Sequence, residues 1–76
     1  MNELTKLMAD ILRMREDEIT EHLSVVDCDM WDSLKHMELI VTIEQTYGIA
    51  LTADEIVSMV KVSEIKRILR NKGIRD

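Results

Sequence analysis

The sequence has no proline and no phenylalanine, and its only glycines are at positions 48 and 73. Chains built from short strands need many glycine and proline turns, so these absences argue against an all-β fold. The residues that dominate instead are Leu, Ile, Met, Glu, Lys and Arg, which favour helices. We therefore predict an all-α fold.

The chain is also short, with 76 residues and a mass of 8.8 kDa. A domain of this length buries only ~60 to 65% of its unfolded surface, so its core is thin. We predict a single domain spanning residues 1–76. A thin core cannot enclose a deep, water-excluding active site, and we expect this chain not to be an enzyme.

Cysteine is limited to Cys28, so an intrachain disulfide is impossible and a reducing, cytoplasmic location fits best. Long apolar runs and a signal-peptide pattern are also lacking, and we expect a protein that does not enter membranes. Cys28 could join His22 and His36 at a metal, but their irregular spacing makes this a weak case. We predict no metal site.

Positive charge is scarce: ten basic residues face fifteen acidic ones, for a net charge of −5. Such a surface repels nucleic-acid phosphates and anionic membranes, so we predict binding to neither. The charge is uneven, since residues 16–32 hold seven acidic side chains and no Lys or Arg. This concentration favours a basic protein partner there, although a solvated acidic loop without a partner is the alternative.

Apolar residues recur at helical spacing near the start of the chain. They predict a first helix from about Glu3 to Arg15, with Asn2 as its N-cap. Residues 16–32 lack sustained periodicity and are predicted to form a loop. A loop of this length in a small domain suggests a functional reason.

A second helix should begin at Asp32 or Ser33, either of which can act as the N-cap, and end at Gly48. Its apolar residues are spread around more than one face. A helix of this kind is usually packed by several neighbours, so we expect it to be central in the fold.

Two further helices are predicted after Gly48. Thr52 and Glu55 can form a capping box, which would start a brief third helix running through Met59. A fourth helix is expected from about Val62 to Asn71, with Gly73 as its stop signal.

Ser33 is the residue with the clearest chemical potential, because it lies where the acidic loop meets the central helix. A phosphate ester there would face free backbone amides and the positive end of the helix dipole. The alternative is that Ser33 or Asp32 only caps the helix. Ser33 and His36 as nucleophile and base would lack an oxyanion hole and protection from water.

The run Asp32-Ser33-Leu34, followed by Glu38-Leu39-Ile40 and Tyr47-Gly48-Ile49, resembles that of acyl carrier proteins. The resemblance covers nearly the whole chain, because all the predicted helices fall where that family has its helices. It implies an acyl-carrier-like four-helix bundle, with three main helices, one short helix and a long loop between the first two.

The resemblance also implies a function. In acyl carrier proteins the motif serine, here Ser33 between Asp32 and Leu34, carries a covalent 4′-phosphopantetheine arm that a phosphopantetheinyl transferase adds from coenzyme A. The thiol of the arm holds an acyl group as a thioester. The chain would be a monomeric carrier that delivers this group to acyl-loading and acyl-processing enzymes with basic docking patches.

Docking in this family uses the central helix and the loop before it, and Asp32 and Leu34 would lie at that surface. The partner-binding residues expected here are Lys35, Met37, Glu38, Val41, Glu44, Ile56 and Met59. Spacing alone leaves a second possibility for Met37 and Val41, which could be ordinary core residues.

Three residues depart from the pattern of fatty-acid carriers, which usually have an acidic or small polar residue after Asp-Ser-Leu. Here Lys35 and His36 follow the motif, and Trp31 replaces the usual small residue before it. These features favour a freestanding carrier of a dedicated polyketide, nonribosomal-peptide or specialised acyl-transfer pathway. The alternatives are a general fatty-acid or aminoacyl carrier and, in another class, an unmodified helical adaptor.

Overall fold

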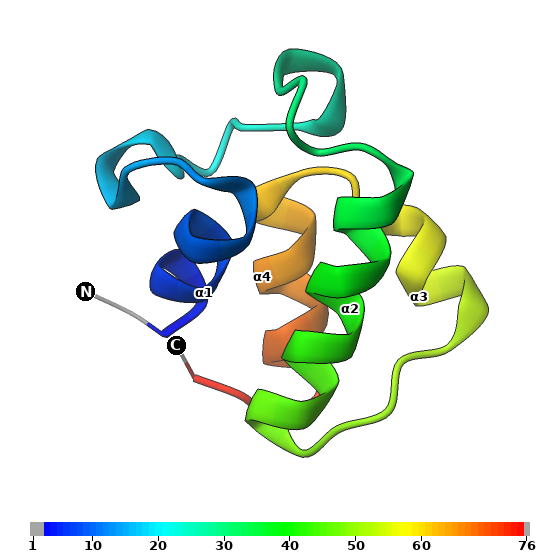
Figure 1. Cartoon of the computed structure of the whole chain (residues 1–76). Coiled ribbons are helices and arrows are strands. Elements are labelled where there is room, and N and C mark those ends of the chain that lie inside the picture. Colours follow the sequence, from blue (N-terminus) through cyan, green and yellow to red (C-terminus); the bar gives the residue numbers. More distant parts are fainter. Residues whose placement is uncertain (1–2, 76) are drawn as a thin grey trace.

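The computed structural model describes residues 3–75, which fold into four α-helices joined by loops (Figure 1). Within these residues, β-type backbone pairing is limited to an isolated bridge between Ser24 and Lys61. The all-α prediction is therefore confirmed. The helices are α1 (Glu3–Leu12), α2 (Ser33–Tyr47), α3 (Ala53–Ser58) and α4 (Val62–Asn71).

The first helix is shorter than predicted, because α1 ends at Leu12 and not at Arg15. Arg13 has a φ of 57°, in the left-handed region, and the Met14 N–H donates to the carbonyl of Ala9 at 3.0 Å. This is the usual closure of a helix C-terminus, with arginine at a position where glycine is more common. The predicted cap, Asn2, lies outside the described residues.

Both predicted ends of α2 are confirmed. At its start, the Lys35 N–H donates to the Asp32 carboxylate at 2.9 Å, so Asp32 is the N-cap. At its end, Gly48 has a φ of 65°, a conformation that glycine adopts at little cost.

The ends of α3 and α4 also follow the sequence signals. The Glu55 N–H donates to Thr52 Oγ1 at 3.2 Å and the Thr52 N–H donates to Glu55 Oε1 at 2.9 Å, which confirms the capping box. Helix α3 ends at Ser58, so Met59 follows the helix. Helix α4 has the predicted bounds, and Gly73, with a φ of 86°, turns the chain after it.

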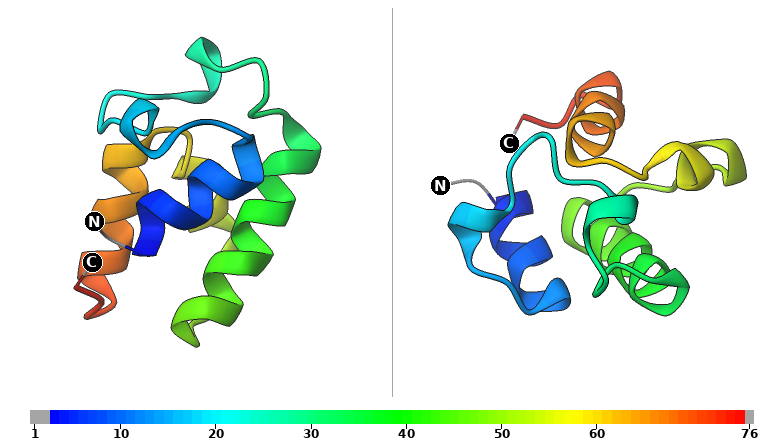
Figure 2. Two further views of the ribbon diagram at one scale, coloured as in Figure 1. Left: turned by 60° about the vertical axis from the view of Figure 1, so that its left-hand side comes forward. Right: turned by 90° about the horizontal axis from the view of Figure 1, so that it is seen from above.

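The core lies between α1, α2 and α4, while α3 flanks α2 and α4 at the edge of the molecule (Figure 2). The side chains that are almost fully buried come mainly from α1, α2 and α4. They are Leu4, Met8, Leu12, Leu39, Ile40, Ile43, Met59, Val62, Ile65 and Leu69.

Helix α2 is less enclosed than its sequence suggests. Its buried residues are Leu39, Ile40 and Ile43, whereas Leu34 is 77% exposed, Met37 50% and Val41 46%. The expectation that several neighbours pack around this helix is therefore wrong for one face. The small domain supplies no further helix within residues 3–75 to cover it, and that apolar face stays in solvent.

The long loop crosses one end of the helices and contains two short 3₁₀ turns within its described length, Glu16–Glu18 and Val25–Asp27 (Figure 1). Its buried side chains are Ile19, Cys28 and Trp31. Backbone hydrogen bonds tie it to the start of α4: the Val25 N–H donates to the Val60 carbonyl, and the Val62 N–H to that of Leu23, both at 3.0 Å. These buried side chains and hydrogen bonds fix the loop to the core.

The helices are all short. Within the described part of the chain, none combines the length and the apolar character needed to cross a membrane.

Candidate functional site

Ser33 is the first residue of α2 and its side chain is exposed. The first amides of a helix have no partner inside the helix, and the Asp32 carboxylate satisfies that of Lys35. The amides of Ser33 and Leu34 therefore remain at the positive end of the helix dipole. The Ser33 hydroxyl is positioned where a phosphate ester would be stabilised.

An open groove with a volume of about 550 Å³ lies beside Ser33. The loop, the first half of α2, α3 and the segment after α3 contribute its walls. Most of the side chains are apolar, and the lining residues are Val25, Trp31, Asp32, Ser33, His36, Met37, Ile56, Val57 and Val60. The groove can hold a flexible, partly apolar group attached to Ser33.

His36 links the loop to α3 within this groove. The indole N–H of Trp31 donates to His36 Nδ1 at 3.0 Å, and His36 Nε2 lies 2.9 Å from the carbonyl oxygen of Ile56. An indole nitrogen can only donate, so Nδ1 accepts and Nε2 carries the hydrogen that it donates to Ile56. Both ring nitrogens are engaged, and His36 is not a free base beside Ser33.

The contact between Trp31 and His36 was missed in the sequence, although their spacing contains a signal for it. Trp31 precedes the N-cap, and His36 is the fourth residue of α2. Residues at these two positions meet in the hydrophobic staple of many helices. Here the staple is polar, and the indole and imidazole rings lie with their centroids 6.2 Å apart.

The possible metal ligands do not come together. Cys28 is buried, with its Sγ 3.7 Å from the sulfur of Met14, and His22 is exposed. Between residues 3 and 75, no cluster of three or more His, Cys, Asp or Glu side chains could hold a metal ion.

The predicted partner contacts on α2 lie mostly at the surface. Met37 and Val41 are exposed, so they do not belong to the core. Lys35 Nζ lies 3.5 Å from the Glu38 carboxylate, and this pairing offsets negative charge near Ser33. Glu44 uses one carboxylate oxygen internally, to accept the Leu51 N–H at 2.8 Å.

The predicted contacts after α2 differ from each other. Ile56 is half-buried and lines the groove. Met59 is 0% exposed and belongs to the core, so its prediction as a partner contact is wrong. The helical spacing that suggested it breaks after Ser58, where the chain turns and carries Met59 inward.

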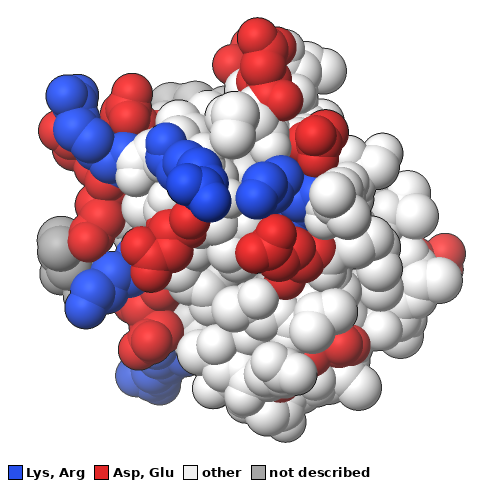
Figure 3. Space-filling model, viewed as in Figure 1, with Lys and Arg blue, Asp and Glu red and all other residues white. Residues whose placement is uncertain are grey.

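Charged side chains are unevenly distributed over this side of the molecule. In the face shown in Figure 3, side chains of both signs gather over α1 and the loop, whereas the part over α2 and α3 is mostly uncharged. Leu34, Val41 and Val57 are exposed on these two helices. The site thus combines an exposed serine, an apolar groove and an apolar surface.

The family described as "Phosphopantetheine attachment site" matches residues 2–69, which is nearly the whole chain. The matched region contains Ser33, the groove and all the described helices except the last residues of α4. An exposed hydroxyl, open amides and an adjacent groove fit a phosphopantetheine arm.

Proposed function

Because the chain belongs to the phosphopantetheine attachment site family, we propose that Ser33 is the residue that carries its arm. Members of this family are carrier proteins with a covalent 4′-phosphopantetheine and are not themselves catalytic. The chain is therefore a substrate of a phosphopantetheinyl transferase and works together with partner enzymes.

The observation that supports Ser33 most strongly is its exposed side chain at the N-terminus of α2, inside the Asp-Ser-Leu motif. The amides of Ser33 and Leu34 would stabilise the phosphate, while Asp32 keeps the first turn closed. When bound, the arm supplies a thiol that holds an acyl group as a thioester. The groove residues of this chain would shield the apolar part of that load from water.

Mass spectrometry after incubation with coenzyme A and a broad-specificity transferase tests this proposal. We expect the wild type to gain one phosphopantetheine and Ser33→Ala to gain none. Ser24→Ala, which changes a serine of the loop, is the matched control and should be modified like the wild type. Modification of Ser33→Ala would show that the site is wrong, and an unmodified wild type would contradict the carrier function.

The proposed docking surface is the exposed apolar face of α2 and α3, with Glu38 at its edge. Partner enzymes with a basic patch would meet the negative loop and Glu38, and such encounters are fast and reversible. Lys35 beside Glu38 weakens the attraction to a strongly basic patch. This supports a dedicated pathway in the cytosol, such as polyketide, nonribosomal-peptide or specialised acyl transfer.

Loading by the malonyl transferase of a fatty-acid synthase distinguishes a dedicated from a general carrier. We expect the modified protein to be loaded slowly, and Lys35→Glu to be loaded several-fold faster because it strengthens the attraction. Lys35→Gln, which removes the charge without reversing it, should fall between the two. Efficient loading of the wild type would favour general fatty-acid synthesis.

A further inference from the structure

Helix α3 forms one wall of the groove but is held only weakly by burial. All six of its residues are described, and none of them is buried. Val57 is 75% exposed, and Ile56 is only partly covered. A helix of six residues is not stable alone in water, so contacts with the rest of the domain must hold it in place.

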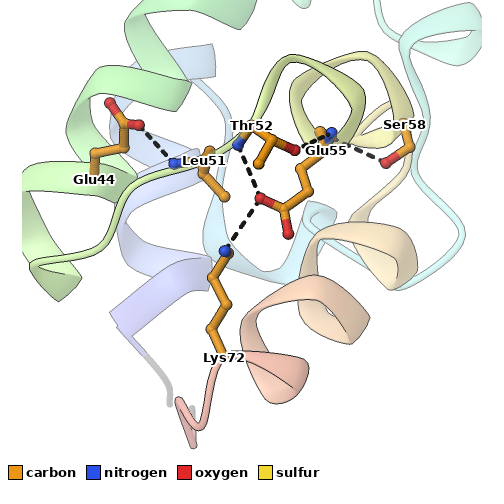
Figure 4. A network of polar contacts seen from close by, with 6 residues as sticks. All are labelled: Glu44, Leu51, Thr52, Glu55, Ser58 and Lys72. Atoms are coloured by element: carbon orange, nitrogen blue, oxygen red, sulfur yellow. Dashed lines mark hydrogen bonds and ion pairs between the residues drawn. The ribbon is translucent and has the colours of Figure 1, made fainter.

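Polar contacts hold the start of α3 and the segment before it (Figure 4). The Leu51 N–H donates to Glu44 of α2 at 2.8 Å, and Lys72 Nζ, after α4, lies 3.1 Å from Glu55 Oε1. The capping box of Thr52 and Glu55 closes the first turn from within the helix. None of these contacts reaches the groove.

The groove side of α3 is held by His36. Its Nε2–H donates to the carbonyl of Ile56, in the second half of α3, at 2.9 Å. The same carbonyl accepts the Met59 N–H at 3.3 Å, which closes the end of the helix. His36 therefore binds the same carbonyl that closes the last turn of α3.

Trp31 fixes the tautomer of His36 that this contact requires. It is 3% exposed, and its indole N–H occupies Nδ1, which leaves the ring hydrogen on Nε2, where the Ile56 carbonyl needs it. We propose that His36, held in this tautomer by Trp31, is a positioning residue that fixes the α3 wall of the groove beside Ser33. The proposal rests on the function given above, because the groove beside Ser33 is where the arm would lie.

Amide hydrogen exchange of the unmodified protein tests the proposal with two variants that each keep one half of the link. The amide of His36→Gln can place an N–H donor near the position of Nε2, whereas the shorter amide of His36→Asn lies near the position of Nδ1 and does not reach the Ile56 carbonyl. We expect His36→Asn to speed exchange at Ile56 and Met59 about tenfold, as the loss of one hydrogen bond implies. His36→Gln should change these rates about threefold or less, and α4 should be unaffected in both.

Two results would overturn the proposal. One is unchanged exchange in α3 of His36→Asn. The other is an equal rise in α3 and α4, which would mean that the substitution loosens the whole domain. Because these measurements need no arm, they stand even if Ser33 is not modified.

The ring nitrogens of His36 give a second, independent readout. In the ¹⁵N spectrum we expect the wild type to show a protonated Nε2 and an unprotonated Nδ1. Trp31→Phe keeps an aromatic ring but removes the indole N–H, and should give a mixture of both tautomers. A wild-type ring with its hydrogen on Nδ1 would show that the link does not exist. Modification of Ser33 in the same variants, measured by mass, separates this outcome from a failure of the carrier function.

Discussion

Helices α3 and α4 are neighbours in the chain, separated by residues 59–61, yet different forces hold them to the domain. Helix α4 buries Val62, Ile65, Ile68 and Leu69, whereas the described residues of α3, Ala53–Ser58, include no buried side chain. Burial of one large aliphatic side chain contributes about 1.5–3 kcal/mol, and a typical hydrogen bond contributes about 0.5–1.5 kcal/mol net.

Because of this difference, α4 contributes mainly to stability, whereas α3 can adapt its position. The burial of α4 holds the thin core together, while the polar contacts of α3 can break and re-form without exposing much apolar surface. Regions held in this way open locally at a low free-energy cost. The adaptable helix is the one beside Ser33 and the groove, where partner enzymes and cargo would have to be accommodated.

The largest expected effect comes from the core. Ile65 is 0% exposed, and Ile65→Ala should lower the free energy of unfolding by about 3 kcal/mol through lost burial and the cavity left behind. This is a large part of the stability of a small domain. Val57→Ala, the matched truncation on α3, should change it by less than about 0.5 kcal/mol. Urea unfolding followed by circular dichroism measures both, and similar losses would contradict the comparison.

The next largest effect is expected from removing the N-caps of α2 and α3. Asp32→Ala removes the cap of α2 and should cost about 1 kcal/mol of global stability. Thr52→Ala removes the cap of α3, but its effect on global unfolding should be smaller, because α3 can open before the rest unfolds. Hydrogen exchange should instead show faster exchange confined to α3. Equal global losses would mean that α3 unfolds only with the whole domain.

The sequence predicted most of the fold because its helix ends are marked by local chemistry. Asp32, Gly48 and the Thr52–Glu55 box each act within a few residues, and all are found at the predicted ends. The end of α1 was missed, since no local signal shows that Arg13 adopts a left-handed conformation.

The site was predictable only in part. The motif around Ser33 is local, but spacing could not tell that Met37 is exposed while Met59 is buried, because this depends on where α3 lies. The link between His36 and Ile56 joins residues that are 20 positions apart. Such contacts follow from packing and are not visible in a periodic pattern.

The smallest expected effect is a dependence of α3 on pH through Glu55. The backbone N–H of Thr52 and the ammonium group of Lys72 lower the pKa of Glu55 below its ordinary value of 4.5. A carboxylate with a lowered pKa in the folded state contributes stability above the ordinary value and loses it as the pH falls through the lowered one. Helix α3 should therefore loosen in acid, below about pH 4.5, while α4, which is held by burial, should respond less.

An NMR titration of amide shifts in α3 and α4 measures this response. Glu55→Gln is the matched control, because it keeps a carbonyl acceptor for the Thr52 N–H and cannot titrate. Its α3 should lose most of the pH dependence that the wild type shows below pH 4.5. If α3 of Glu55→Gln still loosens over the same range, another group controls it. If α4 of the wild type loosens first, burial does not hold α4 more firmly than polar contacts hold α3.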